Sequence, residues 1–331
     1  MSQQQHTMES ILNLGHNFMA SRVFLTGAEL DLYSLLAPKP LSVDEIVAGI
    51  KADQRGMTIL LDALSALGFL IKNGKKYQTE MSLVPLLTSN SPNSLLPMAL
   101  HMCKQWQTWS KLTDVVLGKP PARMKEQGAL AKDHIKAFIG AMHVMALKTA
   151  PEIVSAVNPG HARRLIDVGG GSGSYTLAFL SAVPEMKATL FDLPEVIEIA
   201  LERLQADGMA DRVTLTAGDF YRDELPSGHD LALLSAIIHQ NSLVQNETLY
   251  RKVYRALDSG GRIIVRDHVM SPDRTQPLEG AIFAVNMLAG TPQGGTYTFD
   301  EIKEGLSAAG FTHIRLIRTK GMSSLVEGLK P

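Results

Sequence analysis

The chain has 331 residues, of which 45% are hydrophobic and 20% are charged, and its formal net charge at pH 7 is -1. This length accommodates two domains, and the near-neutral charge gives no electrostatic support for binding to nucleic acid or to an anionic membrane. The single cysteine, Cys103, excludes an internal disulfide and a cysteine-based metal cluster, and the N-terminus lacks the pattern of a signal peptide. We therefore expect a cytoplasmic protein without a membrane-spanning segment.

The first predicted element is a helical region from Glu9 to Leu36, in which apolar residues recur at helical spacing and cover more than one face. Helices that carry more apolar surface than one core requires often pack against a second subunit. Two interpretations of this region remain open, a partly intersubunit surface and an ordinary hydrophobic core.

The next pattern is that of a winged helix. Ser42, with Glu45 three residues later, predicts a capped first helix, a second helix is expected over 54–67, and a hairpin follows at 71–78. In a transcriptional regulator the second helix enters the major groove, but here Arg55 is its only basic residue. DNA binding is therefore the weaker alternative, and the apolar residues of this helix are expected to be buried. These residues are Met57, Ile59, Leu60, Leu61 and Leu64.

Residues 95–148 have the spacing of further helices, with a break at Pro120-Pro121. The last helix places Phe138, Met142 and Met145 on one face. Such a stripe is typical of an ordinary core. It is also a candidate cover for a flat apolar substrate, because methionine adapts to irregular shapes and a glycine-rich segment follows directly.

That segment, Leu165-Ile-Asp-Val-Gly-Gly-Gly-Ser-Gly-Ser174, has the pattern of a buried strand that turns into a helix. Glycine is needed where the backbone takes a positive φ or approaches a ligand, and such a turn directs free N–H groups beyond the edge of the sheet. The glycines do not fit the G-x-G-x-x-G spacing of dinucleotide-binding folds. Their spacing, Asp167-x-Gly169-x-Gly171-x-Gly173, indicates a nucleotide-type site of another kind.

Two further predicted strands end in acids. The strand 188–191 is followed by Asp192, whose carboxylate is suited to accept hydrogen bonds from both hydroxyls of a ribose. The strand 212–216 is followed by Gly218-Asp219-Phe220, where an acid beside an aromatic ring is suited to hold the edge and the face of an adenine. A single strand-end acid is an ordinary cap, but three successive strands that end this way favour a nucleoside-binding site.

A histidine and an acid follow the next two predicted strands. The apolar run Asp230–Ile238 ends at His239, and the strand 261–265 ends at Arg266-Asp267-His268. In doubly wound sheets ligands bind outside the carboxyl ends of the strands, which lie about 4.8 Å apart when they are neighbours. A histidine oriented by a carboxylate is suited to act as a general base, although spacing alone leaves open that His239 merely caps a strand or helix.

The order of these motifs, with Leu233-Leu-Ser-Ala-Ile-Ile-His239 and Gly260-Gly-Arg-Ile-Ile-Val265, resembles the plant-type (caffeic acid and hydroxyindole) small-molecule O-methyltransferases and their bacterial relatives. The resemblance covers nearly the whole chain and implies an α/β fold. It implies a winged-helix dimerisation domain over 1–100, a helical linker over 101–150 that contributes to the substrate pocket, and a Rossmann-like doubly wound domain over 151–331. Members of this family are homodimers that use S-adenosylmethionine. We expect no metal ion, because the acids are assigned to other contacts and no His/Asp cluster has ligand spacing.

The resemblance also implies the roles of single residues. A histidine at the position of His239 deprotonates a hydroxyl for in-line attack on the sulfonium methyl group, and Asp267 stands at the first acid that flanks this base. The predicted acceptor pocket is lined by Phe138, Met142, Met145, Asn286 and Met287. The predicted cofactor contacts are Asp167, Gly169, Gly171, Asp192, Leu193, Gly218, Asp219, Phe220 and Ser235.

Two sites depart from the family pattern. The usual His-Asp-Trp is His239-Gln-Asn241 here, and Thr296 stands where many plant members carry a second flanking acid. Because fewer carboxylates stabilise the imidazolium, methylation of a readily ionised phenol is affected least. Two alternatives to an O-methyltransferase remain. One is a relative of the same fold that methylates carbon or nitrogen or catalyses another reaction, and the other is a noncatalytic winged-helix protein that binds the nucleoside.

Overall fold

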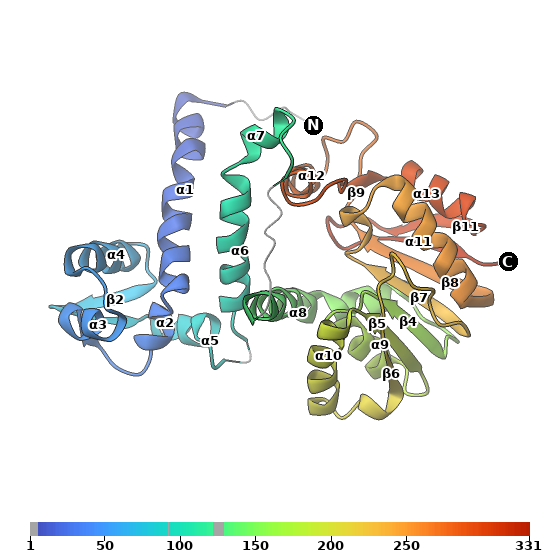
Figure 1. The fold of residues 1–331 in the computed structure, drawn as a ribbon, viewed down its shortest axis with the longest axis horizontal. Coiled ribbons are helices and arrows are strands. Elements are labelled where there is room, and N and C mark those ends of the chain that lie inside the picture. Colours follow the sequence, from blue (N-terminus) through green and yellow to red (C-terminus); the bar gives the residue numbers. More distant parts are fainter. Residues whose placement is uncertain (1–5, 92, 122–128) are drawn as a thin grey trace. The chain divides into compact units, whose positions relative to one another are not determined.

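The computed structural model describes residues 6–91, 93–121 and 129–331 (Figure 1). The chain forms two compact units, Met1–Lys104 and Gln105–Pro331. The second unit contains every predicted cofactor-binding segment and also most of the helices that the sequence suggested as a linker.

The first unit combines helices with a small antiparallel sheet. Its elements are α1 (Met8–Glu29), α2 (Leu32–Leu35), β1 (Leu41–Ser42), α3 (Val43–Ile50), α4 (Gln54–Ala66), β2 (Leu70–Asn73), β3 (Lys76–Thr79), the one-turn η1 (Met81–Leu83), α5 (Val84–Leu87) and most of α6 (Leu96–Trp109). The sheet has the strand order β1-β3-β2, and β2 and β3 form the predicted hairpin. The predicted capping box of α3 is present, because Ser42 Oγ accepts from the Glu45 N–H at 3.3 Å and the Glu45 carboxylate accepts from the Ser42 N–H at 2.7 Å.

Only one face of α4 is buried. Met57, Leu61 and Leu64 are at most 3% exposed and follow the i, i+4, i+7 spacing of one helical face. Ile59 lies on another face and is 54% exposed. The prediction of burial is therefore wrong for Ile59.

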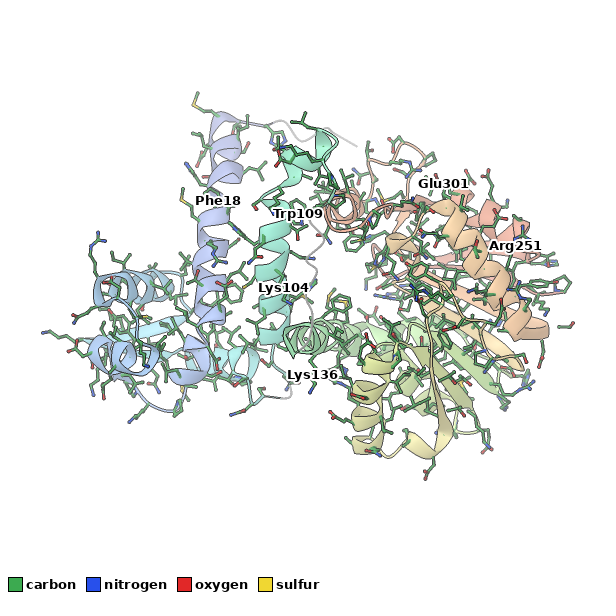
Figure 2. The ribbon with its side chains drawn as sticks, viewed as in Figure 1. Phe18, Lys104, Trp109, Lys136, Arg251 and Glu301 are labelled. Carbon is green, nitrogen blue, oxygen red and sulfur yellow. The ribbon has the colours of Figure 1, made fainter. Side chains whose placement is uncertain are left out.

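Much of α1 lies outside the core of this unit. Its buried residues, Leu25, Gly27 and Ala28, are confined to the last turns. The large apolar residues between Met8 and Met19 are 51% to 80% exposed, and Figure 2 labels one of them, Phe18. They are Met8, Ile11, Leu12, Leu14, Phe18 and Met19. An ordinary core is therefore the wrong interpretation for the first half of this helix.

The second unit is a seven-stranded sheet with the order β11-β12-β8-β7-β4-β5-β6. Its strands are β4 (Arg164–Val168), β5 (Lys187–Asp192), β6 (Val213–Ala217), β7 (His229–Ser235), β8 (Leu257–Asp267), β11 (Thr312–Arg318) and β12 (Ser324–Leu329). The strands from β8 to β6 are parallel, whereas β12 is antiparallel to both of its neighbours. The carboxyl ends of five parallel strands therefore meet at one edge.

Helices cover both faces of this sheet (Figure 1). The helices of this unit, not all of which lie on the sheet, are α7 (Leu112–Val116), α8 (Ala129–Val157), α9 (Ser174–Ala182), α10 (Pro194–Ala206), α11 (Leu243–Ala256), α12 (Leu278–Gly290) and α13 (Phe299–Ala308). The shorter elements are η2 (Ala210–Arg212), β9 (Val269–Met270) and β10 (Tyr297–Thr298). Residues of α8 and α9 form one hydrophobic cluster with the sheet, and residues of α11 and α13 form another. Figure 2 labels Arg251 on α11 and Glu301 on α13.

The end of β7 differs from the prediction. The strand ends at Ser235, three residues before the predicted Ile238. Ala236 adopts a φ of +59°, which turns the chain away from the sheet, and Ile238–Gln240 form a single 3-10 turn, η3. His239 therefore lies in a turn beyond the sheet edge and not at the end of a strand.

Candidate active site

The glycine loop after β4 is shaped for a close ligand. Gly169, Gly171 and Gly173 have φ values of +70°, +57° and +77°, which residues with a Cβ rarely adopt. A Cβ at Gly169 would lie 2.4 Å from Cδ1 of Ile237. A Cβ at Gly171 would have only Ile139 Cδ1 near it, at 3.8 Å, so this glycine leaves space that a side chain would fill.

Asp192, at the end of β5, reaches this loop. Its Oδ2 accepts from the Gly171 N–H at 2.8 Å, and its Oδ1 accepts from the Leu193 N–H at 2.7 Å. Burial raises the pKa of this carboxyl. Each carboxylate oxygen has a further lone pair, so the group is suited to bind the two hydroxyls of a ribose beside Gly171.

Asp167 is placed differently from Asp192. It is 1% exposed, and its Oδ2 accepts from the Thr176 hydroxyl at 2.7 Å. Burial raises its pKa to about 6. Asp167 therefore joins β4 to α9 and supports the loop from within, rather than presenting its carboxylate to a ligand.

The segment after β6 extends the site along the sheet edge. Asp219 Oδ1 accepts from the Tyr221 N–H at 2.9 Å, and the Asp219 side chain remains 31% exposed. Phe220 is partly buried, and one of its ring carbons would lie 3.8 Å from a Cβ at Gly169. A Cβ at Gly218 would lie 2.5 Å from the Phe191 ring, so the chain approaches β5 closely here. The predicted adenine, ribose and glycine-loop contacts thus follow the strand order β6-β5-β4.

His239 and Asp267 form a close pair, as predicted for residues that follow neighbouring strands. His239 Nδ1 lies 2.9 Å from Asp267 Oδ2 and 3.1 Å from Oδ1. The Asp267 side chain is 1% exposed, and that of His239 is 12% exposed. Because the carboxylate holds Nδ1, Nε2 is the ring nitrogen that remains to take a proton.

Three features around this pair were missed by the sequence analysis. The rings of Phe283 and His239 form a T-shaped contact, with a centroid distance of 4.9 Å and an interplanar angle of 89°, which restricts the imidazole plane. The Gly295 N–H donates to the His239 carbonyl at 2.8 Å. A Cβ at Gly294 would lie 2.5 Å from that carbonyl oxygen, so only glycine fits there. The glycine pair Gly294-Gly295 was the available signal for such a close approach.

Ser235 binds the buried guanidinium of Arg266, a contact that the sequence analysis did not predict. Its Oγ accepts from Arg266 Nη1 at 3.1 Å, and the Arg266 guanidinium lies 5.0 Å from the centre of the Tyr175 ring. Arg266 is 7% exposed, and burial lowers its pKa. An arginine directly after the apolar run 263–265 was the signal in the sequence.

The predicted acceptor-pocket residues lie on two helices. On α8, Phe138 and Met145 are 43% and 51% exposed, so an ordinary core is the wrong interpretation for both, and Met142 is half-buried. On α12, Met287 is buried, and Asn286 Oδ1 accepts from the indole N–H of Trp109 at 2.8 Å. The helix α12 contacts the turn that carries His239.

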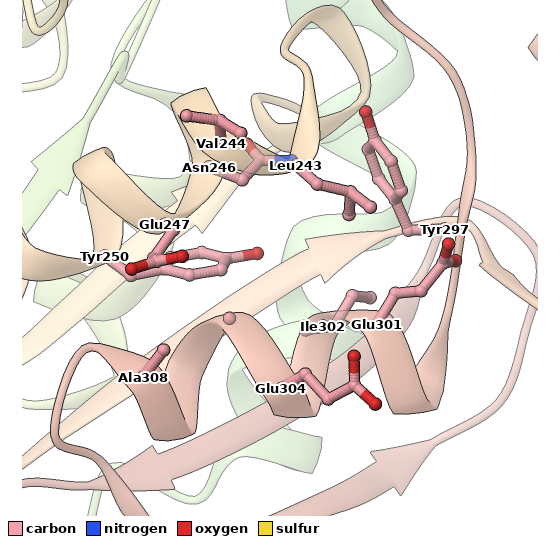
Figure 3. Close-up of a pocket in the computed structure, with 11 residues that line it drawn as sticks. Leu243, Val244, Asn246, Glu247, Tyr250, Tyr297, Glu301, Ile302, Glu304 and Ala308 are labelled. Atoms are coloured by element: carbon pink, nitrogen blue, oxygen red, sulfur yellow. The ribbon is translucent and has the colours of Figure 1, made fainter.

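A separate cavity of about 230 Å³ lies between α11 and α13 (Figure 3). Its walls include Asn246, Tyr250 and Tyr297, and none of the predicted cofactor or acceptor residues lines it. Within the described residues, no three His, Cys, Asp or Glu side chains are grouped to hold a metal ion. In the same part of the chain, no helix combines the length and apolar character needed to cross a membrane.

The comparisons with known proteins agree with this geometry. Residues 127–312 match the O-methyltransferase domain, and residues 12–83 match the O-methyltransferase dimerisation domain. The chain belongs to the O-methyltransferase family. The tetracenomycin polyketide synthesis 8-O-methyl transferase TcmO of Streptomyces glaucescens is 31% identical over 328 residues, which cover 97% of this chain and 96% of that protein.

Vertebrate relatives of this O-methyltransferase are similarly close. Acetylserotonin O-methyltransferase of Gallus gallus is 30% identical, with 97% of this chain and 96% of that protein covered. The crystal structure of human N-acetylserotonin methyltransferase in complex with SAM has a TM-score of 0.83 and 26% identity, and covers 100% of this chain and 99% of that one. This O-methyltransferase therefore uses S-adenosylmethionine, and the alternative of a noncatalytic winged-helix protein is wrong. The match to the dimerisation domain supports a homodimer.

Proposed function

We propose that this enzyme methylates a hydroxyl group of an aromatic or polyketide-like small molecule, with His239 as the general base. The observation that carries the proposal is the pair of His239 Nδ1 and buried Asp267, 2.9 Å apart, beyond the same sheet edge as the glycine loop. The relatives named above act on polyketide and acetylserotonin acceptors, which supports a flat acceptor with an ionisable hydroxyl.

The residues present fit S-adenosylmethionine. The space above Gly171 admits a ligand next to the backbone, Asp192 offers acceptors for the ribose, and Asp219 and Phe220 are suited to the adenine. When bound, this cofactor supplies a methyl group that is already activated by a sulfonium. The protein therefore has to orient an acceptor and free its nucleophile.

The proton step belongs to His239 and Asp267. Asp267 accepts from the Nδ1–H and holds the imidazole so that Nε2 faces the acceptor. Nε2 takes the proton of the acceptor hydroxyl, and the buried carboxylate stabilises the resulting imidazolium. With Thr296 in place of a second acid, the arrangement favours phenols over less acidic alcohols.

The acceptor pocket is proposed to form from α8 and α12. Phe138, Met142 and Met145 supply adaptable apolar surface on α8, and Asn286 and Met287 contribute from α12. No part of this proposal calls for a metal ion, nucleic acid or a membrane, and the single cysteine suits a cytoplasmic location.

The test is a methyl-transfer assay with the purified protein, S-adenosylmethionine and a panel of polycyclic phenols and hydroxyindoles. Mass spectrometry and the ¹³C shift of the new methyl group separate a methoxy product from a carbon-methylated or nitrogen-methylated one. Methoxy products that disappear with His239→Ala support the proposal. Carbon or nitrogen methylation would support the rival that Gln240 and Asn241 favour, because they replace the family's usual acid and aromatic residue.

A further inference from the structure

The turn that carries His239 is held by hydrogen bonds from outside itself. One of them comes from Asn246 on α11, whose Nδ2 donates to the Ile238 carbonyl at 3.0 Å. Another comes from Tyr297, whose hydroxyl donates to the Asn241 carbonyl. The paired residues of β7 and β8 end at Ser235, so these contacts, together with those of Asp267, Phe283 and Gly295, help to fix where the imidazole stands.

Asn241 is the centre of this arrangement. It is completely buried, and its Nδ2 donates to Asn246 Oδ1 at 2.9 Å. Its Oδ1 accepts from the hydroxyl of Tyr221 at 2.5 Å. Both ends of the buried amide are thus paired, which a buried amide requires. The chain of donors runs from Tyr221 to Asn241, then to Asn246, and ends at the carbonyl that precedes His239.

Tyr221 belongs to the segment assigned to the adenine. Its ring lies 4.6 Å from that of Phe220, and its N–H donates to the Asp219 carboxylate. Burial and the charge of Asp219 raise the pKa of Tyr221, so its hydroxyl keeps the proton that it donates. The residue is 49% exposed, and its hydroxyl ties the segment to Asn241. Lys252 holds the backbone of the same segment, because its Nζ donates to the carbonyls of Phe220 at 2.9 Å and Asp223 at 2.7 Å.

We propose that Tyr221 and Asn241 are positioning residues that couple occupation of the adenine site to the placement of His239. Adenine that packs on Phe220 restricts the neighbouring Tyr221, which in turn holds Asn241 and the turn that bears the base. The proposal rests on the proposed function, because it presumes that His239 is the base. It gives Asn241 a role in a position where the family usually carries tryptophan.

Steady-state kinetics provide the first test. Tyr221→Phe keeps the ring and removes only the hydroxyl, and we expect kcat to fall about fivefold to tenfold, the effect of one hydrogen bond. The KM for the acceptor and the Kd for S-adenosylhomocysteine should change less than about threefold, because no ligand contact is removed. Tyr254→Phe is the matched control, since its ring packs on Phe311 in the same unit, at 5.2 Å, and it should leave kcat unchanged. An unchanged kcat in Tyr221→Phe would overturn the proposal.

A double-mutant cycle tests whether Tyr221 acts through Asn241. Asn241→Ala should lower kcat at least as much as Tyr221→Phe, and adding Tyr221→Phe to it should cause no further loss. If the fold losses in kcat of the two single variants multiply in the double variant, the Tyr221 hydroxyl does not act through Asn241. If Asn241→Ala does not fold, Asn246→Ala replaces it in the cycle. This variant keeps the hydrogen bond between Tyr221 and Asn241 but removes the step from Asn241 to the Ile238 carbonyl.

The final measurement needs no acceptor. In protein labelled with ¹³C in the histidine rings, the His239 signal is assigned by its loss in His239→Asn. S-adenosylhomocysteine should shift this signal in the wild type, and in Tyr221→Phe the shift should shrink by at least about half at saturating ligand. An equal shift in both proteins would refute the coupling. If every acceptor assay fails while the shift still depends on Tyr221, the proposed function fails and the coupling stands.

Discussion

The carboxylate of Asp192 accepts the backbone N–H of Gly171 at 2.8 Å, so the end of one strand is hydrogen-bonded to the loop that leaves its neighbour. This bond places an acid beside the one glycine of the loop that has open space above it. Asp192 should therefore contribute to cofactor affinity.

Replacement of Asp192 by alanine should weaken S-adenosylhomocysteine binding about 100-fold, because the two charge-assisted hydrogen bonds proposed for the ribose would be lost. Asp192→Asn keeps an acceptor for the Gly171 N–H and should weaken S-adenosylhomocysteine binding less than Asp192→Ala does. Isothermal titration calorimetry measures both, with the exposed Asp211→Asn as a control that should bind normally. Unaltered affinity in Asp192→Ala would remove Asp192 from the cofactor site.

Loss of the proposed base, His239, should lower the rate of methyl transfer and leave cofactor binding unchanged. His239→Ala is expected to lower kcat about 10²- to 10⁴-fold, the usual contribution of a general base. Asp267→Asn should also lower kcat, because an amide can donate to Nδ1 and thereby favour the tautomer whose Nε2 already carries a proton. Stopped assays with a saturating phenol give kcat, and calorimetry with S-adenosylhomocysteine should give a wild-type Kd for both variants. Full activity in His239→Ala would contradict the assigned role.

Gly169→Ala should destabilise the protein for two separable reasons. The positive φ costs about 1 to 2 kcal/mol with a Cβ present. The new Cβ would also lie 2.4 Å from Ile237 Cδ1, an atom that valine lacks. Urea unfolding measures the free energy of unfolding of Gly169→Ala, of Ile237→Val and of the double variant. The double variant should lose less stability than the two single variants lose together. If the losses of the two single variants simply add, the clash between the new Cβ and Ile237 Cδ1 does not contribute to the destabilisation.

The buried Asp167 should make stability depend on pH. Its folded-state pKa is raised to about 6, above the usual value of an unfolded aspartate, so the folded state favours the protonated form. This contribution is complete below the unfolded pKa, is lost as the pH rises towards 6, and then stays constant. Asp167→Asn cannot ionise and can still accept from Thr176. Its free energy of unfolding relative to wild type should rise by about 2 to 3 kcal/mol between pH 4 and pH 7, and a difference that does not vary with pH would contradict this account.

The exposed apolar face of α1 should belong to the dimer interface. Ile11→Glu with Leu14→Glu places two charges on residues that are 58% and 70% exposed in the single chain. Light scattering after gel filtration should show monomers for this variant and dimers for Lys51→Glu, an exposed change elsewhere in the same unit. A dimer that survives the α1 changes would move the interface to another surface.

Strand-end chemistry was predictable from the sequence because it depends on local order. The acids and the histidine follow apolar runs, and parallel strands bring their ends to one edge, so the meeting of His239 and Asp267 needed only the assumption that their strands are neighbours. The capping box of Ser42 and Glu45 was predictable for the same reason, since its partners lie three residues apart.

Other features depend on contacts that no local pattern contains. Ala236 ends β7 early because it adopts a positive φ, and an alanine in a sequence does not predict a positive φ. Tyr221 and Asn241 are 20 residues apart and meet only because β6 and β7 end at the same edge. The exposure of Ile59 was not predicted, because apolar spacing indicates that a helix has a buried face but does not show how wide that face is.

The pair Gly294-Gly295 limits how this catalyst can be redesigned. Any side chain at Gly294 would collide with the carbonyl of His239, and the N–H of Gly295 is committed to that same carbonyl. A second acid for less acidic alcohols is therefore excluded at Gly294. It has room at Gly295, where an added Cβ would have nothing within 4 Å, and it could also replace Thr296, which is buried and whose carbonyl accepts from Arg274. Evolution of substrate range through this loop is thus closed at the codon for Gly294 and open at the two codons that follow it.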